Sequence, residues 1–341
     1  MSNLLCRQKN DRCLIIAEAG VNHNGSLDIA YKLCDAAKNA GADVVKFQTW
    51  DTDRLITKNV QMADYQECNT GEKESQYDML KKLELSYEDF RKVKSYCDKI
   101  GIVFASTADE EQSLDFLVDV GIPFIKVGSG DIGNIPYLRY IGSKKMPVVL
   151  STGMSSLSDI DISLSALREG GAEDIRLLHC TTNYPCPYDE VNLRAMLTLK
   201  NEYNLPVGYS DHTVGTEVPV SAVALGADII EKHFTLDKKM EGPDHIASTE
   251  PEEFKHMVQQ IRNVEVAMGD GVKQMTSSEK EIKKVVTKRI VASKTIRPGE
   301  FFSEDNVCVK RSDEGERASI WDSIIGKSAS KKYNVDQGIS L

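Results

Sequence analysis

The stretch GADIIEKHFT, residues 226–235, contains the features that decide the fold. Its glycine follows a helical pattern, and glycine suits the left-handed conformation that closes a helix. The apolar run that comes next predicts a buried strand, and this strand finishes in Glu231, Lys232 and His233. We therefore expect a helix, a tight turn and a strand whose carboxyl end carries polar side chains.

The same unit recurs along the chain. Candidate strands lie at 13–18, 43–48, 102–106, 124–128, 147–151, 175–180, 206–210 and 228–232, and helical patterns lie at 26–40, 87–100, 110–120, 134–144, 158–170, 192–203, 216–226 and 251–268. Eight strand–helix units predict an α/β fold, a TIM (β/α)8 barrel. A doubly wound sheet is the alternative, but no G-x-G-x-x-G motif follows the first strand.

Changes in composition divide the chain. We assign residues 1–268 to the barrel, 269–285 to a polar linker and 286–341 to a small β-rich domain with short strands and turn residues. A polar insertion at 51–85 follows the second strand, and an insertion of this size in a βα loop predicts a lid or a substrate loop.

Charge and cysteine content limit the class of protein. The net charge of -10 argues against general binding to nucleic acid or to membrane surfaces. Eight cysteines without a C-x-x-C pair predict reduced thiols. The first residues mix charges into the sequence, and no apolar run reaches membrane-spanning length. We expect a soluble cytoplasmic protein.

Polar residues gather at the carboxyl ends of the predicted strands, where TIM barrels carry their chemistry. They include Glu18, Lys46, Gln48, Thr107, Lys126, Asp131, Ser151, His179, Ser210, His212 and His233. One such residue would indicate only a solvated strand end. Because every strand has one, we predict an active site there, with Glu231 and Lys232 supporting its rim.

Two histidines suggest a metal site. His212 and His233 end neighbouring strands, which lie ~4.8 Å apart in a sheet. Two imidazoles at that spacing can share a divalent ion, although a hydrogen-bonded pair is the alternative. His179 is either a third ligand or a packed residue.

The residues at the remaining strand ends favour the binding of an anion. Lys46 and Lys126 would be costly to bury without a partner. The turns 128–130 and 151–153 contain glycine and serine, which can direct N–H groups and hydroxyls at phosphate oxygens. A phosphorylated, carboxylated substrate is predicted. Glu18 and Asp131 either exchange protons and orient hydroxyls, or pair with the lysines.

The chain resembles the sialic acid synthase family, phosphoenolpyruvate-dependent synthases of nine-carbon sugars such as N-acetylneuraminate and legionaminate. The shared motifs are IIAEAGVNHNGS (15–26), GADVVKFQTW (41–50), KVGSGD (126–131), LSTGMSS (150–156), LLHCTTNYPCP (177–187), GYSDHT (208–213), EKHFTLDK (231–238) and GPDHIAS (242–248). Residues 286–341, with VKR at 309–311, resemble the family's antifreeze-like (SAF) domain.

The resemblance implies a role for each matching residue. His212 and His233 would hold Mn²⁺ or Mg²⁺. Phosphoenolpyruvate would contact Lys46, Thr107, Lys126, Ser129 and Ser151. An open-chain N-acetylmannosamine-type acceptor would contact Glu18, Gln48, Asn69, Tyr184 and Asp244. The partner subunit's Arg311 would reach the acceptor's acyl group in a domain-swapped homodimer.

The implied reaction joins the alkene carbon of phosphoenolpyruvate to the acceptor aldehyde, which the metal polarises. Water then adds, and phosphate leaves with C–O cleavage. Glu18, Asp131, Lys46 and Lys126 would be catalytic. A 6-deoxy 2,4-diacetamido hexose, which leads to legionaminate, is the alternative acceptor.

Several positions depart from the family pattern. Asp131 stands where glutamate is usual, Ala108-Asp109 replaces Pro-Phe, Thr182 replaces an asparagine found in some members, and residues 312–315 lack the usual glycine-rich turn after Arg311. A different acceptor, or a sugar-binding homologue with altered catalysis, stays open. A metal-dependent hydrolase is disfavoured because Asn22-His23-Asn24 offers no H-x-H motif.

Overall fold

The computed structural model describes residues 4–5, 12–62 and 74–341. The chain divides into two compact units, Met1–Gly269 and Asp270–Leu341. Each unit has its own hydrophobic core. No helix in these described ranges has the length and apolar character required to cross a bilayer.

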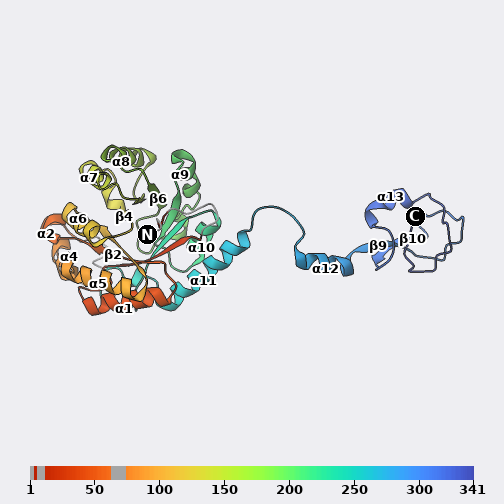
Figure 1. The fold of residues 1–341 in the computed structure, drawn as a ribbon, viewed down its shortest axis with the longest axis horizontal. Coiled ribbons are helices and arrows are strands. Elements are labelled where there is room, and N and C mark those ends of the chain that lie inside the picture. Colours follow the sequence, from red (N-terminus) through yellow and green to blue (C-terminus); the bar gives the residue numbers. More distant parts are fainter. Residues whose placement is uncertain (1–3, 6–11, 63–73) are drawn as a thin grey trace. The chain divides into compact units, whose positions relative to one another are not determined.

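The first unit contains a closed barrel of eight parallel strands (Figure 1), which confirms the predicted fold class. The strands are β1 Leu14–Gly20, β2 Val44–Thr49, β3 Val103–Ala108, β4 Ile125–Val127, β5 Val148–Ser151, β6 Ile175–His179, β7 Val207–Asp211 and β8 Ile229–His233. Strand β1 closes the barrel because it pairs with both β2 and β8. In this register Glu18 lies beside Lys46 on one side and His233 on the other.

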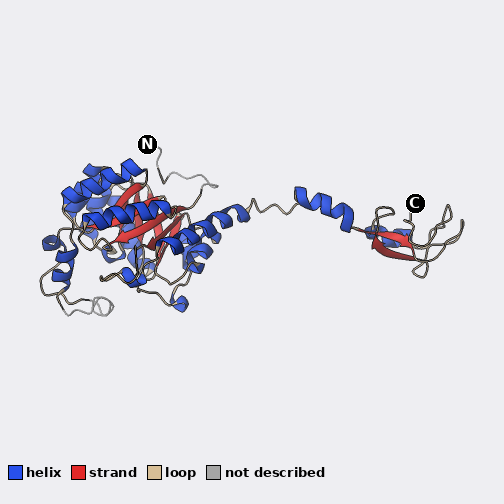
Figure 2. Ribbon diagram, turned by 90° about the horizontal axis from the view of Figure 1, so that it is seen from below, coloured by secondary structure: helices blue, strands red, loops and turns tan. Residues whose placement is uncertain are grey.

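Helices surround the strands in both ribbon views (Figures 1 and 2). They are α1 Leu27–Asn39, α5 Tyr87–Ile100, α6 Glu111–Val120, α7 Ile135–Ser143, α8 Leu157–Gly170, α9 Ala195–Tyr203, α10 Glu217–Ala224 and α11 Pro251–Met268. Their apolar faces and the outward strand residues form the main hydrophobic core. The glycine predicted to close a helix in 226–235, Gly226, has positive φ after α10, and Gly101 and Gly121 cap α5 and α6 in the left-handed conformation.

A smaller apolar cluster fills the barrel interior. It contains Leu14, Ile16, Val44, Phe124, Val149 and Ile229. Side chains two residues apart on a strand share a face. The next inward residues are therefore Glu18, Lys46, Lys126, Ser151 and Glu231. This alternation puts an apolar floor beneath a ring of polar side chains.

The described parts of the insertion after β2 share a small apolar cluster with the ends of β1 and β2. It contains α2 Thr52–Leu55 and α4 Gln76–Leu83, the second of which begins at the Ser75 cap. Met79 and Leu83 of α4 are buried with Val21, Trp50 and Met62. The described parts of the insertion thus pack against Val21 and Trp50, which follow β1 and β2, and the role of the insertion as a lid stays a prediction.

The second unit contains α12 Ser277–Val286, an antiparallel pair of β9 Lys288–Ala292 with β10 Val307–Arg311, and the short helix α13 Trp321–Ile324. Helix α12 lies mostly within the segment 269–285 that we predicted as a linker. It begins at a capping box formed by Thr276 and Glu279. Ile290, Phe302 and Tyr333 belong to the core of this unit.

Candidate active site

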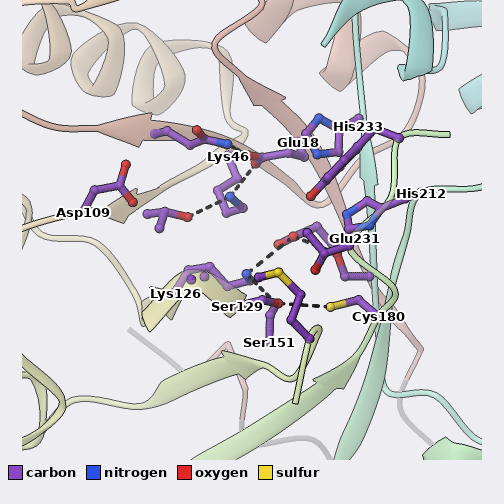
Figure 3. Close-up of a pocket in the computed structure, with 18 residues that line it drawn as sticks. Glu18, Lys46, Asp109, Lys126, Ser129, Ser151, Cys180, His212, Glu231 and His233 are labelled. Atoms are coloured by element: carbon purple, nitrogen blue, oxygen red, sulfur yellow. Dashed lines mark hydrogen bonds and ion pairs between the residues drawn. The ribbon is translucent and has the colours of Figure 1, made fainter. Parts of the chain in front are cut away.

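A cavity of about 210 Å³ opens at the carboxyl ends of the barrel strands. Figure 3 shows the side chains that line it. The structure brings together most of the predicted site residues there: Glu18, Lys46, Gln48, Thr107, Lys126, Ser129, Ser151, Tyr184, His212 and His233.

One side of the cavity is built around Lys46. Its Nζ lies 2.5 Å from Glu18 Oε2 and donates to Thr107 Oγ1 at 2.9 Å. Gln48 Nε2 donates to the other Glu18 oxygen at 2.9 Å. Lys46 and Glu18 are fully buried, so their pairing lowers the cost of holding two charges away from water.

A second buried pair faces the first (Figure 3). Lys126 Nζ donates to Ser151 Oγ at 2.8 Å and lies 3.5 Å from Glu231 Oε1. Ser210 Oγ donates to the same Glu231 oxygen at 3.1 Å, whereas Glu231 Oε2 is buried without a hydrogen-bond partner. Glu231 thus belongs to the cavity wall, a more direct position than the rim support that we expected.

The alternation of side chains along β8 places Glu231 inside the barrel, so the predicted position at the rim was wrong. Glu231 is two residues before His233, so both face the interior. Lys232 faces the other way, where its Nζ lies 2.5 Å from Asp211 Oδ2 and 2.7 Å from Thr213 O. Lys232 therefore ties β7 to β8 outside the cavity.

The buried lysines and glutamates of the cavity shift one another's pKa values. Burial raises the pKa of Glu18 to about 7, against the opposing effect of Lys46. Burial also opposes ionisation of Glu231, but Lys126 and Lys46 outweigh it and lower the pKa of Glu231 to about 2. For Lys46, the neighbouring carboxylates overcome burial and raise the pKa. Both lysines have carboxylate partners before any substrate enters.

A turn of small residues lies beside Lys126. Ser129 Oγ accepts from the Gly153 N–H at 3.0 Å and lies 3.3 Å from Cys180 Sγ. A Cβ on Gly153 would come within 2.3 Å of Thr182 Oγ1, so the close approach requires glycine. The Thr182 hydroxyl is buried, lines the cavity and has no hydrogen-bond partner. These groups can bind phosphate oxygens.

His212 and His233 lie together at one side of the cavity (Figure 3), with ring centroids 5.5 Å apart. His212 Nδ1 lies 2.6 Å from Thr181 O, which leaves its Nε2 as the available ligand atom. Nδ1 of His233 is buried without a hydrogen bond. Burial lowers the pKa of both imidazoles, so both are neutral and can donate lone pairs to a metal.

These two histidines fit a weakly held divalent ion. In the described ranges, no group of three or more His, Cys, Asp or Glu side chains could hold one. The other coordination positions would therefore come from substrate and water. His179 does not join the pair: its Nε2 lies 2.9 Å from Val191 O and its ring packs against Tyr209. Of the two alternatives for His179, the structure supports the packed residue.

A second cavity of about 200 Å³ adjoins the first. Gln48, Tyr184 and His233 line both cavities. The second is also lined by Asp244, whose pKa burial raises to about 6. Its other lining residues are Val21, Met79, Leu80, Leu83 and Pro243.

Three predicted residues are absent from the described lining of these cavities. Asp131 is outside the cavity lining and accepts from Asn134 Nδ2 at 3.0 Å. Arg311 is exposed at the end of β10 in the second unit. Asn69 lies outside the described residues.

Asp109 lines the cavity although we did not predict it as a site residue. It lies across the cavity from the histidine pair (Figure 3). Burial, reinforced by the charge of Asp131, raises the pKa of Asp109 to about 7. Its position directly after Thr107-Ala108 at the end of β3 was the available signal.

Comparison with known proteins adds a separate set of findings. Residues 33–273 match the NeuB family. The chain is 45% identical over 333 residues to N,N'-diacetyllegionaminic acid synthase of Legionella pneumophila, covering 96% of this chain and 93% of that protein. It is 46% identical over 328 residues to the Campylobacter jejuni protein of the same name, covering 96% and 98% respectively.

A solved structure is also similar. The N-acetylneuraminic acid (sialic acid) synthetase of Leptospira borgpetersenii, in complex with citrate, gives a TM-score of 0.71 at 34% identity. The match covers 80% of this chain and 90% of that one.

Proposed function

Because the chain belongs to the NeuB family, we propose that it is a nonulosonic acid synthase, a transferase that condenses phosphoenolpyruvate with an open-chain N-acylated sugar. The observation that carries this proposal is the first cavity. It combines two buried lysines, a serine–glycine turn and a pair of neutral histidines on one face of the barrel. These are the groups that a phosphorylated carboxylate and a metal-assisted aldehyde need.

Phosphoenolpyruvate would bind on the lysine side. Lys46 and Lys126 supply positive charge, and the hydroxyls of Thr107 and Ser151 already lie within hydrogen-bond distance of these lysines. Ser129 and the buried Thr182 hydroxyl supply neutral contacts for phosphate oxygens. As charge moves onto the departing phosphate, the two fixed ammonium groups stabilise it.

The reaction forms one C–C bond and breaks one C–O bond. The alkene carbon of phosphoenolpyruvate attacks the aldehyde carbon, water adds to the adjacent carbon, and phosphate leaves. Glu18 is held between Lys46 and Gln48, and Gln48 lines both cavities. We assign proton exchange with the new hydroxyl to Glu18 on this geometry.

His212 and His233 would hold Mn²⁺ or Mg²⁺, and the bound ion would supply Lewis-acid polarisation of the aldehyde. Tyr184 packs beside both rings, with centroids 4.2 Å from His212 and 5.4 Å from His233. His233 lines both cavities, and His212 lines the first.

We favour the 6-deoxy 2,4-diacetamido hexose over N-acetylmannosamine as the acceptor. Over the aligned residues the chain is 45% and 46% identical to two N,N'-diacetyllegionaminic acid synthases, but 34% identical to the N-acetylneuraminic acid synthetase. The departures at Asp109 and Asp131 from the sialic acid synthase pattern support an acceptor that differs from N-acetylmannosamine.

The assembly is also proposed. We infer that residues 286–341 form a SAF domain and that the partner subunit's Arg311 contacts the acceptor's acyl group in a domain-swapped homodimer. Support comes from the exposed position of Arg311 on a separately packed unit. We further infer that the enzyme works in the cytoplasm, which agrees with the free thiols of Cys34, Cys97, Cys180, Cys186 and Cys308.

The test is phosphate release from phosphoenolpyruvate by the full-length protein. Each acceptor is supplied in turn, before and after treatment with a chelator, and Mn²⁺ is then added back. We expect release that requires an acceptor and returns with Mn²⁺. Absence of release with every acceptor in metal-replete protein would overturn the proposal and favour a sugar-binding homologue.

A further inference from the structure

The junction of the two cavities locates the acceptor. Gln48, Tyr184 and His233 line both of them. The new bond joins phosphoenolpyruvate in the first cavity to the aldehyde carbon of the acceptor. The aldehyde must therefore lie at the junction, and the rest of the open-chain sugar must extend into the second cavity.

Beyond the junction, most of the side chains that line the second cavity are apolar. Val21, Met79, Leu80, Leu83 and Pro243 line it, and Asp244 is the polar exception. Val21, Met79 and Leu83 are at most 8% exposed and pack with Trp50 and Met62. Because these side chains are already closely packed, a rearrangement to fit a differently shaped group would cost free energy.

Such a wall distinguishes a methyl group from a hydroxyl group. A methyl at the far end of the sugar would lose contact with water and gain apolar contacts. A hydroxyl packed against these apolar side chains would lose its hydrogen bonds to water, and among the described lining residues beyond the junction the one polar side chain that could replace them is Asp244.

The charge of the second cavity disfavours a phosphate. In the described part of the chain, its lining residues include no lysine or arginine. Its one ionisable carboxyl, Asp244, lies 3.8 Å from His233 Nδ1 and would repel a phosphorylated sugar. Both lysines of the site line the first cavity instead.

We propose that Met79, Leu80 and Leu83 of α4 determine acceptor specificity, selecting a sugar that ends in a methyl group over its 6-hydroxy and 6-phospho counterparts. The proposal rests on the synthase function proposed above. It assigns a role to the insertion after β2: helix α4 supplies the part of the acceptor site that recognises the end of the sugar furthest from the aldehyde.

The test compares two leucine variants. Leu80 lines the cavity and is only partly buried, so Leu80→Asn changes the wall without emptying the core. Leu55 packs against the same cluster without lining the cavity, which makes Leu55→Asn the matched control. For each variant, kcat/KM is measured with 2,4-diacetamido-2,4,6-trideoxymannose, N-acetylmannosamine and N-acetylmannosamine 6-phosphate.

We expect the wild-type protein to prefer the 6-deoxy sugar. Leu80→Asn should reduce this preference about tenfold, mainly through a higher KM for the 6-deoxy sugar, since a pocket of this kind discriminates a small group by roughly 10–200-fold. Leu55→Asn should keep the wild-type preference. Leu80→Lys adds a cation to the wall formed by α4 and should raise activity on the 6-phosphate above that of Leu80→Asn.

The outcomes separate the two proposals. A wild-type enzyme that prefers the 6-hydroxy or 6-phospho sugar, or equal shifts in preference for Leu80→Asn and Leu55→Asn, would overturn the specificity assignment and leave the synthase function standing. Wild-type protein that releases no phosphate with any of the three sugars would overturn both. Circular dichroism and thermal unfolding of each variant establish that the comparison is between folded proteins.

Discussion

Replacement of Lys126 by methionine tests whether the buried charges of the site depend on each other. Lys126 and Glu231 lie 3.5 Å apart with side chains 4% and 7% exposed. At an effective dielectric constant of ~20, this separation corresponds to about 5 kcal/mol of attraction. Lys126→Met leaves Glu231 with only the charge of Lys46 to offset its burial, so we expect the free energy of unfolding to fall by about 3–5 kcal/mol.

A double-mutant cycle measures the interaction directly. Urea unfolding is followed for Lys126→Met, Glu231→Gln and the double variant. Removing both charges leaves no ion unpaired, so the double variant should be more stable than the sum of the single changes predicts by about 2 kcal/mol or more. Arg139 and Glu169 provide the control: they are 2.7 Å apart but 57% and 56% exposed, and their coupling should stay below ~1 kcal/mol.

Acid should weaken the same interaction. The folded-state pKa of Glu231 is lowered from 4.5 to about 2, so its ionised form contributes stability above pH 4.5 that is lost as the pH falls toward 2. Glu231→Gln should lack this part of the acid dependence. A coupling energy at 126–231 no larger than that of the exposed pair would refute the reasoning from burial.

Three further predictions concern other parts of the barrel. His212→Ala should lose phosphate release and weaken Mn²⁺ binding by roughly tenfold or more in calorimetry, with an unchanged circular dichroism spectrum; undiminished Mn²⁺ binding would contradict the ligand assignment. Gly208→Ala should lower the free energy of unfolding by about 1–3 kcal/mol, because a Cβ there would lie 2.4 Å from Ile229 O where β7 meets β8; a change below ~0.5 kcal/mol in urea unfolding would show that the strands can shift. The folded-state pKa of Asp109 is raised to about 7, so its protonated form contributes stability that is lost as the pH rises toward 7. As the pH rises from 4 to 7, Asp109→Asn should therefore gain stability relative to the wild type. A difference in free energy of unfolding that stays constant over this pH range would contradict the prediction.

The repeating strand–helix unit was readable from the sequence because each strand is a short apolar run and several helices end in glycine. The same reading located Lys46, Lys126 and His233, since a polar residue at the end of a buried strand is conspicuous. The alternation of side chains along a strand puts Glu231 on the same face as His233. The prediction of Glu231 as rim support was therefore wrong, and Glu231 faces Lys126.

The second cavity was not predictable in the same way. Its wall comes from Met79, Leu80 and Leu83 on a short helix, and their pattern equally suits an ordinary buried face. Only the packing of α4 near Val21 and Trp50 shows that part of this face borders a cavity. The roles of Asn69 and Arg311 stay predictions, because Asn69 lies outside the described residues and Arg311 belongs to the separately packed second unit.

The paired lysines have a consequence for turnover. Each ammonium group already has a carboxylate neighbour, at 2.5 Å for Lys46 and at 3.5 Å for Lys126. An incoming anion must compete with these internal partners, so part of its binding energy replaces an interaction that existed before. When phosphate departs, the internal pairs re-form and no bare cation is left to retain it. The site therefore binds anions less tightly than two unpaired lysines would, and its own carboxylates help to displace the product phosphate.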